Sequence, residues 1–282
     1  MTHSGSLGIA AATKTVLKYG VMLLLGVIMV APFLWMISTS LKPPQQIATV
    51  PPEWIPSTFV WANYAEAWTT VPFHLFLLNS TKISVLVVLG VLFICSLAGY
   101  SFAKVKFPGS GVLFGFLLAT LMIPSTVRLI PQYIVFRRLG WIDTHYALII
   151  PPIIANTFGT FLLRQFFITL PSELEDSAWV DGCGLFATYW RIMLPLAKPA
   201  LGVLAIFVFR SSWNQLLGPL IFINTLEKMT APLGLAVFQG EFGTLWGPLM
   251  AGSTIIMLPI MVVYLLFQRT FTEGIALSGL KQ

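Results

Sequence analysis

Residues 83–103 read ISVLVVLGVLFICSLAGYSFA and contain no charged side chain between Lys82 and Lys104. The stretch is long enough to cross the hydrocarbon core of a bilayer as a helix, which needs about 20 apolar residues. A helix satisfies every backbone hydrogen bond within itself, so a single apolar stretch in lipid takes this form. The sequence therefore predicts a membrane-spanning helix here.

Other stretches of similar length lie on both sides of this one. Four are also free of charged side chains, and a fifth is interrupted only by Arg210. In chain order they are residues 19–41, 107–127, 144–163, 199–226 (with the arginine) and 242–268. Six spans of about 20 residues would use about 120 residues and leave room for modest loops. We therefore predict an all-α integral membrane protein with six transmembrane helices.

The composition excludes several classes of protein. Charged residues make up 9% of the 282 residues, against about 25% in soluble domains, and the mean hydropathy is +0.86. A soluble enzyme or a disordered chain would not have these values. The net charge of +6 comes from scattered residues that form no basic stripe, which argues against a nucleic-acid partner. No spacing typical of metal ligands or of catalytic residues occurs among the histidines and cysteines, namely His3, His74, His145, Cys95 and Cys183.

The distribution of basic residues predicts the orientation and the organisation of the chain. With the N-terminus in the cytoplasm, nine Lys and Arg residues fall inside and six outside, as the positive-inside rule favours. The first apolar stretch is longer than the core of a cleavable signal peptide, so we expect it to remain as a span. We expect a cytoplasmic segment 1–17, a first transmembrane helix 18–41, an external loop 42–74, a five-helix membrane domain 75–269 and a cytoplasmic tail 270–282. Five prolines should prevent regular helix in the external loop, namely Pro43, Pro44, Pro51, Pro52 and Pro56.

Residues 171–200, PSELEDSAWVDGCGLFATYWRIMLPLAKPA, form the longest cytoplasmic loop and hold four of the ten acidic residues. Ser172 and Glu175 match a capping box that starts a helix, and Asp176 suits the positive end of that helix. Leu174, Ala178 and Asp181 would share one side of it, with Trp179 nearby. This predicts a short apolar ridge that fits a groove on another protein, while the alternative is a solvated loop.

A glycine turn and a second helix should follow. Gly182 or Gly184 can take the left-handed conformation that ends a helix. A second short helix could then run from Leu185 until Pro195 stops it.

The same loop resembles the signature of importer-type ABC permeases, which is Glu-Ala-Ala, three residues, Gly, nine residues, Ile, any residue, Leu, Pro. The spacing matches throughout, although Asp176 and Ser177 replace the usual Glu and Ala. The matching residues are Asp176, Ser177, Ala178, Gly182, Ile192, Leu194 and Pro195. Other segments resemble the permeases of maltose-type carbohydrate importers, namely residues 52–64, 79–80, 213–214, 237–240 and 273–279.

This resemblance implies a type I ABC importer permease fold, with residues 75–269 as the ABC transmembrane domain and 171–198 as its coupling loop. The residues expected to contact the ATPase are Glu175, Asp176, Ser177, Ala178, Asp181, Gly182, Ile192, Leu194 and Pro195. The implied partners are a second homologous permease, two ATP-binding subunits and an extracytoplasmic solute-binding protein, in the inner membrane of a prokaryote. The chain has no glycine loop ending in Gly-Lys-Ser or Gly-Lys-Thr, so ATP and Mg²⁺ are expected on the ATPase, and the chain itself is expected to bind no cofactor.

The expected function is therefore to form half of a pathway that imports a sugar, oligosaccharide or polyol. The alternative is a self-sufficient secondary carrier or channel. No Asp or Glu lies inside any of the six stretches, which argues against coupling to protons. A sodium-coupled carrier that uses backbone carbonyls remains open.

A polar cluster inside the fifth stretch is the candidate lining of the pathway, because polar groups in a span normally face a protein or water-filled interior. Its members are Arg210, Ser211, Ser212, Trp213, Asn214 and Gln215. Amide groups can bind sugar hydroxyls, and Trp213 could stack on a sugar ring. Alternatively, Asn214 and Gln215 only bond a neighbouring helix.

Arg210 has no intramembrane carboxylate to pair with in this chain. Its partner would be a carboxylate or carbonyl of the second permease or an anionic group of the solute, unless it reaches the membrane interface. Asn79, with Lys82, is a further candidate for an outer gate, or else a helix cap.

Overall fold

Helices make up most of the chain in the computed structural model, which describes residues 4–240 and 243–279 and the side chains of residues 14–240 and 243–266. The predicted all-α fold is confirmed. Parts of the predicted terminal segments 1–17 and 270–282 lie outside the described residues. The side chains of residues 273–279, where a resemblance was noted, also lie outside them.

Within the described residues, four helices are long and apolar enough to cross a membrane. They are Lys14–Ser40, Phe73–Lys104, Tyr146–Thr169 and Trp246–Leu266. A helix pair bent by 75°, Leu185–Leu196 and Lys198–Trp213, could serve as a fifth span. These helices coincide with the first, second, fourth, sixth and fifth stretches read from the sequence.

The third predicted span, residues 107–127, is not one long helix. It forms α5 (Ser110–Ala119) and a single 3₁₀ turn, η1 (Thr120–Met122). Pro124 disfavours the helical conformation in the residue before it, and Ile123 is extended, with φ −84° and ψ 114°. The helical path therefore stops after 13 residues, the expectation of an unbroken helix is wrong, and the count of six spans stays a prediction.

The described chain divides into two compact units, which are described separately. The first contains residues 1–70 and 238–255, and the second contains residues 71–237 and 256–282. The elements of the first are α1 (Ser4–Ser40), α2 (Pro44–Ile47), α3 (Ala62–Thr69), β1 (Gln239–Gly240), β2 (Gly243–Thr244) and the first turns of α15 (Trp246–Gly279). The two short strands pair antiparallel, with Gln239 opposite Thr244.

The expected external loop is ordered, but it contains helix, contrary to the prediction. Pro44 stands in the first turn of α2, where a missing N–H is tolerated, and α3 forms in a segment without proline. Asn63 fixes the loop to the end of α1, because its Nδ2 donates to the carbonyls of Ser40 and Lys42 at 2.9 and 3.1 Å.

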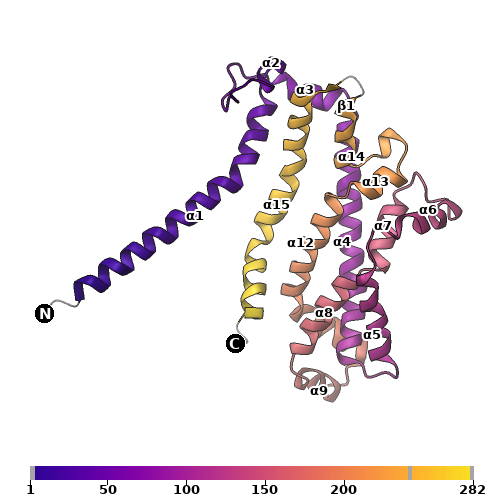
Figure 1. Ribbon diagram of the computed structural model, residues 1–282. Coiled ribbons are helices and arrows are strands. Elements are labelled where there is room, and N and C mark those ends of the chain that lie inside the picture. Colours follow the sequence, from indigo (N-terminus) through magenta and orange to yellow (C-terminus); the bar gives the residue numbers. More distant parts are fainter. Residues whose placement is uncertain (1–3, 241–242, 280–282) are drawn as a thin grey trace. The chain divides into compact units, whose positions relative to one another are not determined.

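The second unit is organised around α4 (Phe73–Lys104), against which α7 (Tyr146–Ile154), α8 (Thr157–Thr169) and α12 (Lys198–Trp213) pack (Figure 1). Glycine lets α8 approach α4 closely. A Cβ on Gly99 would lie 2.9 Å from the backbone nitrogen of Arg164, too close for any side chain. The close contact positions α8 and α12 around one buried core.

The core of the second unit consists of apolar side chains from these four helices and the segments beside them. Fully buried members are Ile83, Val87, Val91, Leu163, Phe167, Met193 and Leu204. Beyond α12 the unit also contains α13 (Leu217–Phe222), η3 (Leu226–Lys228), α14 (Ala231–Leu235), the start of η4 (Ala236–Phe238) and α15 from Ile256 onward. In Figure 1, α13 and α14 lie toward one end of α4, and the segment containing α9 lies beyond its other end.

Candidate functional site

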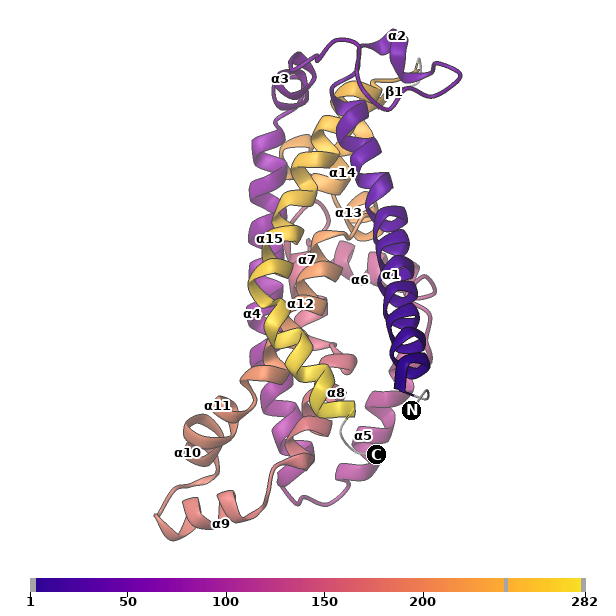
Figure 2. The ribbon, with the colours of Figure 1, turned by 90° about the vertical axis from the view of Figure 1, so that its left-hand side faces the viewer.

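A helical hairpin lies beyond the end of α4 that is formed by Lys104 (Figures 1 and 2). Its elements are α9 (Glu173–Val180), α10 (Leu185–Thr188), the π-helical turn η2 (Tyr189–Met193) and α11 (Leu194–Leu196). The chain then bends by 75° into α12. The predicted order of helix, glycine turn and helix is confirmed.

Gly182 makes the turn between the two arms of the hairpin. Its φ is +78°, a left-handed conformation that side chains other than glycine rarely adopt. The backbone N–H of Gly182 donates to the carbonyl of Trp179 at 3.0 Å, and that of Cys183 donates to the carbonyl of Ala178 at 2.9 Å. These two bonds form a Schellman motif, which satisfies the last carbonyls of α9. Gly184 has a negative φ, so Gly182 is the turn residue.

Two details of the predicted hairpin are wrong. Ser172 makes no side-chain cap, because its own backbone is already helical, with φ −69° and ψ −24°, whereas a capping residue is normally extended. The second arm ends at Leu196, one residue beyond Pro195. The bend follows at Ala197, which has ψ 0°.

Glu175 points into the protein and connects α9 to α4. Its side chain is buried, with 7% exposed. Its Oε1 accepts a hydrogen bond from the hydroxyl of Tyr100 at 3.1 Å, and its Oε2 lies 3.4 Å from the Nζ of Lys104. Lys104 also donates to the carbonyl of Leu170 at 2.7 Å. The start of α9 is therefore fixed to the last turns of α4.

The outward face of the hairpin differs from the predicted ridge. Ala178 is buried, and Leu174 is half-buried against the core, so these residues face the protein itself. Trp179 is 54% exposed and Val180 88% exposed. In the second arm the rings of Phe186 and Trp190 stack at 6.3 Å, and both are exposed as well. The hairpin thus does present an apolar surface, but through residues other than those expected.

The residues predicted to contact an ATPase fall into three groups. Those exposed on the hairpin are Asp176, Ser177, Asp181, Gly182 and Pro195. Ile192 and Leu194 are half-buried, whereas Glu175 and Ala178 are buried. The exposed acids lie beside Trp179 and Val180, so an apolar surface with an acidic rim is present.

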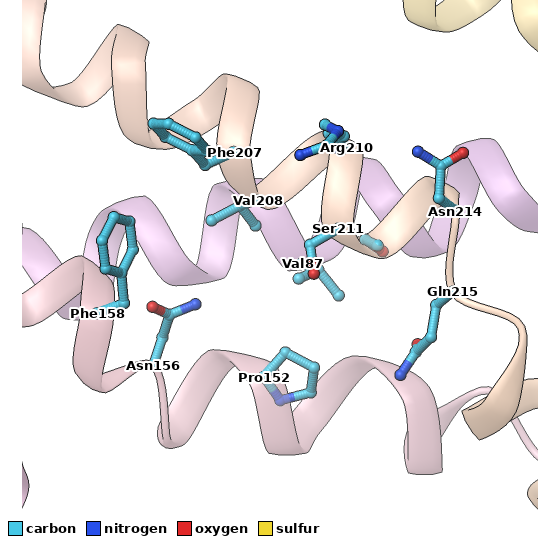
Figure 3. A pocket seen from close by; sticks show the side chains of 11 residues that line it. Val87, Pro152, Asn156, Phe158, Phe207, Val208, Arg210, Ser211, Asn214 and Gln215 are labelled. Atoms are coloured by element: carbon cyan, nitrogen blue, oxygen red, sulfur yellow. The ribbon is translucent and has the colours of Figure 1, made fainter. Parts of the chain in front are cut away.

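A cavity of about 510 Å³ lies between α12 and the α7–α8 segment, with α4 behind it (Figure 3). Its lining residues are Val87, Pro152, Asn156, Phe158, Phe207, Val208, Arg210, Ser211, Ser212, Asn214 and Gln215. Figure 3 shows Arg210, Ser211 and Asn214 on one wall and Pro152 and Asn156 on the opposite wall. The cavity therefore combines amide, hydroxyl and guanidinium groups with an apolar base.

The structure brings together five of the predicted pathway residues, namely Arg210, Ser211, Ser212, Asn214 and Gln215. Helical spacing accounts for Arg210 and Asn214, because residues four apart share a face. Whether these side chains touch a solute stays a prediction.

The structure contradicts the expectation for Trp213. Its side chain is 1% exposed and does not line the cavity. Its Nε1–H donates to the carbonyl of Ile256 at 3.1 Å, and its ring stacks on Phe209 at 5.5 Å. The indole is therefore a packing group between α12 and α15, and it presents no face to a sugar.

Asn79 also lies away from the cavity. It is buried in the interior of α4, so it is not a helix cap. Its Nδ2 donates to the carbonyls of Glu227 and Met229, at 2.8 and 3.0 Å. Asn79 therefore fixes the segment around η3 to α4 and is not a helix cap, while its part in an outer gate stays a prediction.

Sequence reasoning missed Asn156. It separates α7 from α8, and its Oδ1 accepts a hydrogen bond from the backbone N–H of Gly159 at 2.8 Å, which caps α8. Pro151 and Pro152 precede it. A polar capping residue soon after two prolines inside an apolar stretch is the signal that could have identified this break and the polar group beside it.

A second cavity of about 400 Å³ adjoins the first, because both are lined by Pro152 and Gln215. Its other polar lining residues are Ser125, Arg128 and Gln132. The sequence analysis placed Arg128 just after the third apolar stretch. In the structure the helix break at Pro124 separates Arg128 from α5. The polar surface therefore continues from α12 toward α6 (Leu129–Arg138).

An ion pair joins the loop before α7 to the segment after α13. Lys228 Nζ lies 2.8 Å from Asp143 Oδ2, which also accepts a hydrogen bond from the hydroxyl of Thr225 at 2.6 Å. These hydrogen bonds, with Lys228 as the largest contributor, hold the pKa of Asp143 well below its usual value. In the part of the chain that the structure describes, no cluster of three or more potential metal ligands occurs.

Residues 90–276 match the protein family described as binding-protein-dependent transport system inner membrane component. The chain is 34% identical to the sn-glycerol-3-phosphate transport system permease protein UgpE of Pectobacterium atrosepticum, with 82% of this chain and 85% of that protein covered. It is 34% identical to the arabinooligosaccharides transport system permease protein AraQ of Halalkalibacterium halodurans, with 80% and 81% covered.

A solved structure of similar fold comes from a bacterial ABC transporter involved in the import of the acidic polysaccharide alginate. The two chains superpose with a TM-score of 0.78 at 20% sequence identity, over 95% of this chain and 99% of that one. At this identity the likeness concerns the fold.

Proposed function

The chain belongs to the family of binding-protein-dependent transport system inner membrane components, and on that premise we propose that it forms half of the translocation pathway of an ATP-driven importer. It is a multi-pass membrane protein. Its partners would be a second homologous permease, two ATP-binding subunits that hold ATP and Mg²⁺, and an extracytoplasmic solute-binding protein. Both termini would lie in the cytoplasm.

The solute that we propose is a carbohydrate, polyol or related polyhydroxylated molecule. Relatives over most of the chain carry names of glycerol-phosphate and arabinooligosaccharide transport permeases. The lining of the larger cavity supports the same class, because Ser211, Asn214 and Gln215 offer both donors and acceptors for hydroxyl groups. The competing function, a carrier that works without an ATPase, does not explain the hairpin.

The hairpin is the observation that carries the proposal. Trp179 and Val180 expose large apolar surfaces at the end of α9, and exposed apolar groups with a polar rim are typical of protein interaction sites. Asp176 and Asp181 supply the rim. The hairpin would therefore dock in a groove of the ATP-binding subunit.

Coupling would follow from the way in which the hairpin is attached. When ATP closes the two ATPase subunits, the docked hairpin would move with them. The contacts of Glu175 with Tyr100 and Lys104 would pass that movement to α4, against which α8 and α12 pack. The cavity between α12 and the α7–α8 segment would then open alternately to the two sides of the membrane.

Purification of the tagged chain from its native membrane, followed by ATPase assays with and without binding protein and sugars, tests this function. We expect an ATP-binding protein to copurify and its activity to rise with one loaded binding protein. Asp176→Ala should lower that stimulation several-fold, because it removes one of the acids beside the apolar docking surface. Glu66→Ala, which removes an exposed acid on α3, is the matched control and should leave the stimulation unchanged.

Recovery of the chain without an ATPase, together with solute uptake into liposomes in the absence of ATP, would contradict the proposal. The secondary-carrier function would then replace it. Equal stimulation in the Asp176→Ala and Glu66→Ala variants would mean that Asp176 does not belong to the docking surface.

A further inference from the structure

Arg210 is a cation inside a span, and no acidic side chain within the described part of the chain pairs with it. It lies in the last turn of α12, is exposed and lines the larger cavity. Among the described residues it makes no ion pair or hydrogen bond through its side chain. A charged side chain at membrane depth normally pairs with another group or lines a solute pathway. Because Arg210 lines the cavity, we look for its role there.

The adjoining cavity contains a second cation of the same kind. Arg128 lines it, is exposed, and likewise has no ion pair within the described chain. Pro152 and Gln215 belong to both linings, so the two arginines line neighbouring parts of one polar surface. Their charges therefore act on the same region of space.

Among the residues that the structure describes, no carboxylate lines either cavity. Two of the acids with described side chains are already paired elsewhere, Glu175 with Lys104 and Asp143 with Lys228. The joint lining therefore carries two positive charges and no negative one. Cationic linings of this kind select anions in pores, because low-dielectric walls strengthen the field of each fixed charge.

We propose that the imported solute is a polyhydroxylated molecule that carries a carboxylate or phosphate group, and that Arg210 binds this group. This inference rests on the proposed function and specifies its substrate class. The planar guanidinium can donate two parallel hydrogen bonds to either anion. Asn214, Gln215 and Asn156 lie in the same lining, where their amides bind the hydroxyl groups. Arg128 attracts the anion in the adjoining cavity.

The test is solute uptake by the complete complex in proteoliposomes, given ATP and its binding protein. The solutes are supplied as a mixture of matched pairs: glycerol with sn-glycerol 3-phosphate, and neutral oligosaccharides with the corresponding uronate oligosaccharides. We expect mass spectrometry to find anionic members accumulated and their neutral counterparts excluded. Accumulation of a neutral member overturns the inference while leaving the proposed function intact. ATP-dependent accumulation of no solute would contradict the proposed function instead.

Variants of Arg210 separate a solute contact from a contact with the second permease. Arg210→Gln should raise the KM for the anionic solute at least tenfold and lower the preference over its neutral counterpart by a similar factor. Arg210→Lys keeps the positive charge but cannot donate two parallel hydrogen bonds. Its KM for the anionic solute should therefore lie between those of the unmodified complex and of Arg210→Gln. Arg138→Gln, an exposed arginine on α6 outside both cavities, is the matched control and should resemble the unmodified complex. An Arg210→Gln complex that loses thermal stability but keeps the same anion preference would overturn the inference.

Discussion

The Nζ of Lys104 lies 3.4 Å from the Oε2 of Glu175, and both side chains are about nine-tenths buried. This ion pair joins the last turn of α4 to the first turn of α9. The hydroxyl of Tyr100 donates to the other carboxylate oxygen, so the carboxylate of Glu175 is bound on both sides. A hairpin held in this way can transmit a movement to α4 instead of bending independently of it.

Glu175→Gln should uncouple ATP hydrolysis from transport. Loss of the carboxylate leaves the buried ammonium of Lys104 without its counter-charge, and breaking a buried ion pair costs about 3 kcal/mol or more. We expect the number of solute molecules imported per ATP to fall several-fold while the ATPase still copurifies.

Glu173→Gln is the matched control for that variant, because it changes an exposed glutamate in the same turn of α9. It should leave coupling unchanged. The exchanged pair Lys104→Glu with Glu175→Lys should recover part of the lost coupling. If Glu173→Gln and Glu175→Gln behaved alike, the buried pair would have no role in transmission.

Gly182→Ala should weaken the hairpin specifically. The left-handed backbone at φ +78° is strained for alanine, by about 1 kcal/mol, and the turn positions the exposed Trp179 and Val180. We expect a several-fold lower yield of ATPase in the copurified complex. Gly140→Ala introduces the same strain at φ +69° outside the hairpin, and an equal loss in that variant would contradict the prediction.

Trp213→Phe should lower stability without changing solute preference. The variant removes the hydrogen bond from the indole N–H to the carbonyl of Ile256, and a typical intramolecular hydrogen bond contributes about 0.5–1.5 kcal/mol. The melting temperature of the detergent-solubilised complex measures this loss. Trp61→Phe, at an exposed tryptophan before α3, should have little effect. If Trp213→Phe changed the preference between sugars, Trp213 would contact the solute, which would contradict its assignment as a packing residue.

Asp143→Asn should cost about 1 kcal/mol or less at neutral pH, because the ion pair with Lys228 is partly exposed. The folded protein lowers the pKa of Asp143, so the unfolded chain takes up the proton first. The contribution to stability is therefore present above about pH 4 and is lost as the pH falls further.

Thermal unfolding at pH 7 and at progressively lower pH should thus show a difference between Asp143→Asn and the unmodified protein that shrinks on acidification. Glu227→Gln, an exposed acid beside Lys228, serves as the control. A difference that grows as the pH falls would contradict the assigned direction of the pKa shift.

The features that could be predicted from the sequence depend on local chemistry. Gly182 could be identified as the turn because left-handed backbone is a property of glycine itself. The apolar stretches marked the long helices because membrane thickness sets their length. The sequence also shows Pro124, which disfavours helical backbone at Ile123. This proline was sufficient to predict that residues 107–127 do not form one helix.

The features that could not be predicted depend on which side of a helix meets the rest of the protein. Leu174 and Ala178 do share a face of α9, as their spacing requires, but that face turns inward. In α12 the same spacing places Arg210 and Asn214 together at the cavity and Trp213 on another face. Their place in one polar cluster of an apolar stretch led to the prediction that all three line the pathway, whereas the packing of α12 against its neighbours separates them.

Solute accumulation in proteoliposomes that contain the chain with its partner permease, with and without the ATP-binding subunits, tests the importer function most directly. We expect accumulation only when the ATP-binding subunits, ATP and the loaded binding protein are all present, and a several-fold decrease when the hairpin carries Gly182→Ala. Accumulation by the permeases without ATP-binding subunits would contradict an ATP-driven importer.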